Sequence, residues 1–170
     1  MRTFITWGLI ILMLCTIGWL AKSSFEKIQQ RKEIEQKSST LPDLKLYTLD
    51  SLAFDAFPMS DKSVVLIHFN TTCEHCHYEV LAIKDAADEF NDAEVIFFST
   101  EALSLIRPFA SASGLGEHTN IHFTKISFTD VTNIVGVLSV PHIFIYGPDK
   151  KLRKEFKGET RPEAILKYLR

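Results

Sequence analysis

The chain has 170 residues, 46% of them hydrophobic, and a formal net charge of −2 at pH 7. This composition is typical of a globular protein and excludes an intrinsically disordered chain. The charge balance offers no concentrated basic patch for phosphates, so we expect no nucleic-acid partner.

The first predicted element is a membrane anchor at residues 4–21, a run of 18 residues without a charge. As a helix it would extend about 27 Å at ~1.5 Å per residue, which just spans a bilayer core. Trp7 and Trp19 lie near its two ends, where aromatic residues gather at membrane interfaces. A cleaved signal peptide is disfavoured because the bulky Trp19 stands where a small residue is needed. A lipoprotein is disfavoured because Leu14 precedes Cys15, so we expect an uncleaved single-pass anchor.

Residues 22–40 are polar and of mixed charge, which predicts a juxtamembrane helix or stalk. A Ser/Thr run that ends at Pro42 marks a domain boundary, so we expect one domain at residues 41–170. Basic residues are more numerous after the anchor than before it, where only Arg2 stands. The positive-inside rule alone would therefore keep this domain in the cytoplasm.

The domain shows strand and helix patterns in alternation. We expect a hairpin from 44–48 and 52–54, strands at 64–69 and 94–99, helices at 73–91, 103–113 and 129–137, strands at 139–146 and 152–156, and a closing helix at 162–169. The run 64–69 is continuously apolar, as in a strand buried on both faces. The helix 73–91 rests on an apolar stripe at helical spacing, formed by Cys76, Val80, Ile83, Ala87 and Phe90. Such alternation predicts an α/β domain around one central sheet.

Cys73 and Cys76 form a Cys-x-x-Cys motif at the first turn of the helix 73–91. Free amides and the positive end of the helix dipole favour a thiolate there and lower the pKa of the thiol. The thiolate is the attacking species in disulfide exchange. We predict that Cys73 attacks a partner's disulfide, and that the less accessible Cys76 resolves the mixed disulfide. A protonated His75 would make the protein a stronger oxidant, whereas Glu74 would oppose this effect.

A second sequence feature that indicates a functional site is the pair Val140-Pro141, just before an apolar strand. Proline entering a core strand removes a donor of the hydrogen-bond ladder. We therefore predict a cis proline whose loop lies against the cysteines and whose exposed backbone can bind an extended substrate peptide. His68, in the strand 64–69, is expected to be a hydrogen-bonded core residue rather than a ligand.

Residues 41–170 resemble the TlpA/ResA-like branch of the thioredoxin superfamily. The matching pieces are residues 41–44 (Leu-Pro-Asp-Leu), the strand 64–69, the motif 73–76 followed by Glu79, Val140-Pro141, and Gly158. The resemblance implies a thioredoxin-like fold, with a central mixed sheet flanked by helices after an N-terminal transmembrane helix. It implies a single-pass protein of the bacterial cytoplasmic membrane with its catalytic domain on the periplasmic, extracytoplasmic side.

The resemblance also implies dithiol–disulfide exchange with protein thiols and disulfides. Cys73 would be the nucleophile, Cys76 the resolving thiol and Pro141 the cis proline. No cofactor is expected, and electrons would come from an upstream donor of unknown identity.

Three departures from the family pattern bear on this activity. Thr72 replaces the usual Trp before the first cysteine, and His75 replaces a frequent Pro, as in DsbA-like oxidants. Ile67 stands where thioredoxins carry a buried Asp, so proton transfer to Cys76 needs another group or water. We expect a reductase, with a DsbA-like oxidase as the alternative.

Two other classes compete with this interpretation. A Cu(I)- or Zn²⁺-binding module would combine thiolates and imidazoles, drawn from Cys73, Cys76, His75, His77 and His142. The chain has no second Cys-x-x-Cys, and we expect no resident metal. A peroxiredoxin is disfavoured because Asn70 stands where that family has Thr.

Overall fold

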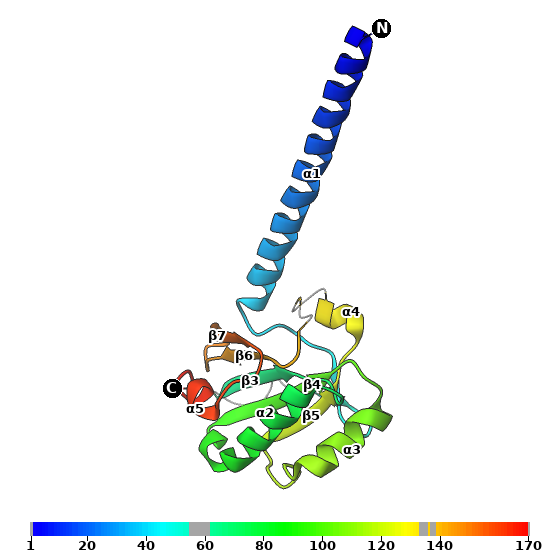
Figure 1. Cartoon of the computed structure of the whole chain (residues 1–170). Coiled ribbons are helices and arrows are strands. Elements are labelled where there is room, and N and C mark those ends of the chain that lie inside the picture. The colour runs from blue at the N-terminus through cyan, green and yellow to red at the C-terminus, as the bar shows by residue number, and fades with distance from the viewer. Residues whose placement is uncertain (1, 55–61, 133–135, 137–138, 170) are drawn as a thin grey trace. The chain divides into compact units, whose positions relative to one another are not determined.

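The computed structural model describes the whole chain except residues 1, 55–61, 133–135, 137–138 and 170. The chain divides into two compact units, Met1–Gln36 and Lys37–Arg170. The first is formed by the long helix α1, Arg2–Ser38, except for its last two residues, which belong to the second unit (Figure 1). No helix in the described part of the chain combines the length and apolar character needed to cross a membrane. Most side chains of residues 4–21 lie outside that part, so the anchor and the stalk stay predictions.

The second unit is built on a seven-stranded sheet in the order β2-β1-β5-β4-β3-β6-β7. The strands are β1 Leu46–Tyr47, β2 Ala53–Phe54, β3 Ser63–His68, β4 Ala93–Ser99, β5 Ile121–Lys125, β6 His142–Tyr146 and β7 Leu152–Lys157. β4 runs parallel to β3 and β5, and the other pairings are antiparallel. This confirms the predicted central mixed sheet, including the short hairpin of β1 and β2.

Helices flank the sheet. They are α2 Glu74–Asp85, the 3₁₀-helix η1 Ala87–Phe90, α3 Leu103–Ser113, α4 Phe128–Asp130 and α5 Pro162–Leu166. α2, α3 and α5 lie on one face of the sheet, over a core that includes Ile67, Ile83, Phe90, Phe97 and Ile165 (Figure 1). The opposite face has its own core, which includes Leu44, Leu66, Phe98, Ile126 and Tyr146. Because both faces are covered, every residue of β3 and β4 is buried.

The predicted helix 73–91 is wrong in one respect, because it breaks after α2. Ala86 leaves helical geometry, with φ −110° and ψ 14°, and η1 follows it. A 3₁₀-helix has three residues per turn, so Ala87 and Phe90 still face the core together. All five residues of the predicted apolar stripe are buried, as the spacing indicated.

The sequence analysis missed β5, which lies between β4 and β1. The polar residues His122 and Thr124 interrupt its apolar pattern, yet both form hydrogen bonds. The Thr124 hydroxyl donates to the Phe97 carbonyl at 3.1 Å, and His122 Nε2 lies 3.2 Å from a carboxylate oxygen of Glu94. The alternation of Ile121 and Phe123 was the signal that could have revealed the strand.

Three other boundaries differ from expectation. The predicted helix 129–137 begins at Phe128 as α4, and most of its residues after 132 lie outside the described ones. The strand expected at 139–146 begins at His142, because the residues before it form the proline loop. The closing helix ends at Leu166, and a turn follows.

Candidate active site

The two cysteines lie where β3 leads into α2. Cys73 is the N-cap of α2, and its Sγ accepts a hydrogen bond from the Cys76 backbone N–H at 3.3 Å. The turn before the helix is held by Asn70, whose Oδ1 accepts from the Thr72 backbone N–H (2.9 Å) and hydroxyl (2.7 Å). Both cysteines are free thiols. Cys73 is partly exposed and Cys76 is 1% exposed, which is the difference in accessibility that the sequence predicted.

Burial makes Cys76 a poor nucleophile until it loses its proton. Desolvation raises the pKa of the Cys76 thiol to about 12, and the hydrogen bond with Cys73 and the charge of Glu79 act in the same direction. Only the thiolate attacks a disulfide. The resolving step therefore needs a group that accepts the Cys76 proton.

Glu79 lies three residues after Cys76 on the inward face of α2 and is 1% exposed. Its Oε2 accepts a hydrogen bond from the Thr160 backbone N–H at 2.7 Å. Its Oε1 is buried and accepts no hydrogen bond from any residue that the structure describes. Burial raises the pKa of the Glu79 carboxyl to about 7, against the Thr160 N–H and with the help of the Glu159 charge.

A buried carboxyl that titrates near neutral pH beside a thiol is suited to proton transfer. The sequence analysis noted Glu79 only as part of the family motif and gave it no role. The available signal was an acidic residue beside Val80 on an otherwise apolar stripe.

The Val140–Pro141 peptide bond is cis, which confirms that prediction. The loop lies against the first cysteine, because the Cys73 thiol donates to the Val140 carbonyl at 3.8 Å.

Two buried histidines hold the start of this proline loop. His68 on β3 and His142 on β6 are directly paired across the sheet. His68 Nδ1 donates to the Ser139 carbonyl at 3.3 Å, so His68 is the hydrogen-bonded core residue that was predicted. His142 Nε2 donates to Glu155 Oε1 at 2.6 Å, which leaves its Nδ1 to accept from the Ser139 hydroxyl at 3.3 Å. Burial lowers the pKa of both imidazoles, that of His68 to about 4.

No family model matches the sequence, and no curated protein matches it. Solved structures do match. A secreted disulfide oxidoreductase of Mycobacterium tuberculosis, described as homologous to E. coli DsbE, is 19% identical, with 75% of this chain and 88% of that one covered at a TM-score of 0.58. StoA from Bacillus subtilis is 13% identical, with 75% and 94% covered at a TM-score of 0.59. The chain has the thioredoxin-like fold. ScoI from Arabidopsis thaliana with copper bound shares it, at 13% identity, 74% and 94% coverage and a TM-score of 0.58.

In this thioredoxin-like domain, the turn of residues 158–160 after β7 joins three parts of the site. The Gly158 N–H donates to the Pro141 carbonyl at 2.8 Å. A Glu159 carboxylate oxygen lies 3.0 Å from His75 Nδ1, and the Thr160 N–H binds Glu79. Gly158 has a φ of +94°, a conformation that residues with a side chain rarely adopt.

The two residues between the cysteines point outward. Glu74 accepts a hydrogen bond from the Tyr78 hydroxyl at 3.1 Å, and both side chains are exposed. The His75 side chain is 69% exposed and pairs with Glu159. The His75 ring is thus directed at the Glu159 carboxylate instead of at Cys73 alone.

The structure does not assemble the alternative metal site. His75 pairs with Glu159, His142 with Glu155, and His77 Nε2 donates to the Thr71 carbonyl at 2.9 Å. Across the described part of the chain, no group of three or more His, Cys, Asp or Glu side chains is arranged to hold a metal ion. The set considered from the sequence, Cys73, Cys76, His75, His77 and His142, therefore does not form such a group.

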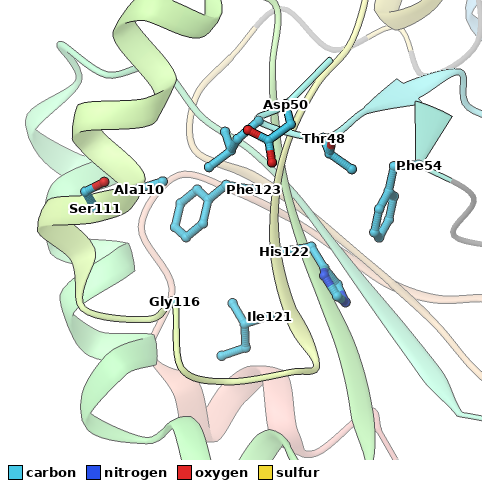
Figure 2. Close-up of a pocket in the computed structure, with 10 residues that line it drawn as sticks. Thr48, Asp50, Phe54, Ala110, Ser111, Gly116, Ile121, His122 and Phe123 are labelled. Atoms are coloured by element: carbon cyan, nitrogen blue, oxygen red, sulfur yellow. The ribbon is translucent and has the colours of Figure 1, made fainter. Parts of the chain in front are cut away.

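Figure 2 shows a cavity of about 340 Å³ between the β1–β2 hairpin, the end of α3 and β5. Asp50 lies above the ring of Phe123 in this view, and His122 and Phe54 lie at the other side. None of the predicted site residues is among its described lining residues. We therefore place the candidate chemistry at Cys73 and not in this cavity.

Proposed function

We propose that the thioredoxin-like domain is a TlpA/ResA-like thiol–disulfide oxidoreductase that exchanges disulfides with partner proteins. One observation carries this proposal: an accessible Cys73 at a helix N-terminus, with the buried Cys76 behind it and the cis-proline loop beside it. The fold shared with the secreted disulfide oxidoreductase of Mycobacterium tuberculosis supports it.

The exchange would proceed in two steps. The Cys73 thiolate attacks a partner's disulfide, forms a mixed disulfide and releases one partner thiolate. Glu79 then accepts the Cys76 proton, and the Cys76 thiolate attacks the Cys73 sulfur. This forms the Cys73–Cys76 disulfide and releases the second partner thiolate, so two electrons have passed to the partner. An upstream electron donor must then reduce the pair again.

We propose the reductase direction. An imidazolium directed at the Cys73 thiolate would stabilise the reduced form and favour an oxidase. His75 is instead exposed and paired with Glu159, which weakens that influence.

Trapping experiments test the exchange and the assigned roles, in a Cys15→Ala background that removes the third thiol. Cys76→Ser should accumulate mixed disulfides with partner proteins on non-reducing gels, because nothing resolves them. Cys73→Ser should accumulate none. Equal trapping by the two variants would contradict the roles, and two free thiols after mild oxidation of the parent would contradict the mechanism.

We further propose that residues 4–21 anchor the chain, that residues 22–40 form a stalk, and that the domain faces the extracytoplasmic side of a bacterial membrane. The uncharged apolar run supports the anchor, and the little need for such an enzyme in a reducing cytoplasm supports the location. A C-terminal reporter that is active only outside the cytoplasm should be active. A reporter active only in the cytoplasm would show that the flanking charges decide the orientation.

A further inference from the structure

A serine just before the proline loop is paired with a buried histidine, which is in turn paired with a glutamate. The Ser139 hydroxyl donates to His142 Nδ1 at 3.3 Å, and His142 Nε2 donates to Glu155 Oε1 at 2.6 Å. A hydroxyl, an imidazole and a carboxylate joined in this order activate serine in hydrolases, and the same constellation recurs on unrelated folds. Neither cysteine belongs to this chain of hydrogen bonds, so the disulfide exchange leaves it without a role.

The His142 imidazole is fixed in place and able to accept a proton. It is 4% exposed and stacks on the Phe144 ring, with centroids 4.5 Å apart. Burial lowers its pKa below the ordinary value of 6.5, so the ring is neutral at pH 7. The Glu155 carboxylate, which Lys157 Nζ also contacts at 3.4 Å, accepts from Nε2 and thereby fixes the tautomer. The free lone pair of the ring is therefore on Nδ1 and points at Ser139.

The Ser139 hydroxyl is accessible, and a free hydrogen-bond donor follows it directly. Ser139 is exposed, and its carbonyl accepts from His68 Nδ1 at 3.3 Å, which fixes the backbone of the nucleophile. The next residue, Val140, is partly exposed, and its N–H donates to no acceptor among the described residues. In α/β-hydrolases the N–H of the residue after the nucleophile is one of the donors that stabilise the oxyanion. The Val140 N–H is available for the same purpose.

The surroundings of Ser139 limit the size of the acyl group. None of the cavities at the β1–β2 hairpin, beside β3 and at α5 has Ser139 among its described lining residues. Sites for larger ligands are concave and bury most of the ligand surface. A small acyl group, such as acetyl, is therefore the class of substrate that fits this exposed nucleophile.

We propose that Ser139 is the nucleophile of a second site, which hydrolyses esters of small acyl groups with His142 as general base and Glu155 as its positioning residue. Ser139 Oγ attacks the carbonyl carbon, and its proton passes to His142 Nδ1. The ester C–O bond then breaks, and the same proton passes to the leaving alcohol. Water attacks the acyl-serine with the help of the same imidazole, which releases the carboxylic acid and restores the Ser139 hydroxyl.

A fluorophosphonate tests the nucleophile in the full-length protein, because it phosphonylates activated serines with loss of fluoride. Peptide mapping by mass spectrometry should place the label on Ser139. Ser139→Ala should abolish this label, whereas Ser111→Ala should leave its rate unchanged. Ser111 is the matched control, because it is exposed on α3 and its hydroxyl has no histidine partner among the described residues.

Two further variants test the histidine and the glutamate. His142→Gln should slow the labelling about 100-fold, since a positioned base contributes ~10²–10⁴ in rate. Glu155→Gln should lower the maximal rate of labelling about tenfold and leave the half-saturating concentration unchanged, which a merely structural role would not do. The Glu155 side chain is 38% exposed, so this variant keeps the test valid even where His142→Gln does not fold.

Hydrolysis itself is measured with p-nitrophenyl acetate. The parent should release several equivalents of p-nitrophenolate, about tenfold faster than Ser139→Ala. Thiolates also react with this ester, but they do so equally in both proteins. The proposal is wrong if Ser139 is not labelled, if Glu155→Gln is labelled at the parent rate, or if Ser139→Ala hydrolyses the ester as fast as the parent. None of these outcomes bears on the disulfide exchange, which the trapping of mixed disulfides tests separately.

Discussion

Two glutamates are buried near opposite ends of the central strands, and they differ in how many of their carboxylate oxygens have a partner. Glu94, at the start of β4, is 5% exposed, and its two oxygens lie 3.5 Å from Lys62 Nζ and 3.2 Å from His122 Nε2. Glu79, behind the cysteines, is 1% exposed and has one buried oxygen without a partner among the described residues. Buried polar atoms in folded proteins are almost always hydrogen-bonded. The exception here lies where the proposed exchange needs a proton acceptor.

The largest difference between the two glutamates should appear in the resolving step. Glu79→Gln removes the proton acceptor for Cys76, and a positioned general base contributes about 10²–10⁴ in rate. We expect release of a preformed mixed disulfide, followed by stopped-flow, to slow by about 100-fold at pH 7. The parent rate should rise with pH through about 7 as Glu79 loses its proton, and this rise should be absent from the variant.

The matched control for this measurement is Glu94→Gln. It removes a buried carboxylate of the same kind at the other end of the sheet, so the rate of release should stay near that of the parent. Equal slowing by both substitutions would indicate a general effect on the fold.

A smaller difference between the two glutamates should appear in the free energy of unfolding and its dependence on pH. Burial raises the pKa of Glu79 from its ordinary value of 4.5 to about 7 in the folded domain, so the native state binds more protons between these values. Stability from this group is therefore fully present below pH 4.5 and is lost as the pH rises to 7, by about 3 kcal/mol at most. Urea unfolding at pH 4 and pH 8 should show a smaller loss for Glu79→Gln than for the parent.

At pH 8 the two substitutions should change the free energy of unfolding in opposite directions. Glu79→Gln should stabilise the domain, because it removes a desolvated charge. Glu94→Gln should destabilise it, because Lys62 and His122 lose their partner. A Glu79→Gln variant less stable than the parent at pH 8 would contradict the assigned environment of this carboxyl.

The smallest expected effect concerns two of the three histidine–glutamate pairs, His75–Glu159 and His122–Glu94. Exposed ion pairs are worth about 0.2–1 kcal/mol, and about 30 mV corresponds to ~1.4 kcal/mol for a two-electron couple. His75→Pro should therefore make the reduction potential of the Cys73–Cys76 pair more negative by at most about 20 mV, as measured by equilibration with glutathione. His122→Gln, at the other end of the sheet, should leave it unchanged. A more positive reduction potential in His75→Pro would contradict the expected effect of His75 on the Cys73 thiolate.

The parts of the molecule that the sequence predicted depend on short-range patterns. The apolar run of β3, the position of Cys73 at a helix start and the proline before β6 are each visible within a few residues. These patterns were sufficient for one central sheet, for the different exposure of the two cysteines and for the cis bond, whereas the mixed character of the sheet was implied by the family resemblance.

The parts that were missed depend on partners far along the chain. β5 contains three polar residues, His122, Thr124 and Lys125, and the Thr124 hydroxyl donates to a carbonyl 27 residues away. The environment of Glu79 is completed by Thr160, 81 residues later. Neither contact is visible in the sequence, so the weak local signals, the alternation of Ile121 and Phe123 and the acidic Glu79 on an apolar stripe, could be interpreted only in three dimensions.

The turn of residues 158–160 has a consequence for any attempt to change the reduction potential of this protein by mutation. Its three consecutive residues contact the proline loop, His75 and Glu79 in order. A substitution there alters substrate docking, thiolate electrostatics and proton affinity together, because the backbone joins them within one turn. The proline loop and the thiol environment are therefore expected to change together in any variant of this turn, and neither can be altered there alone.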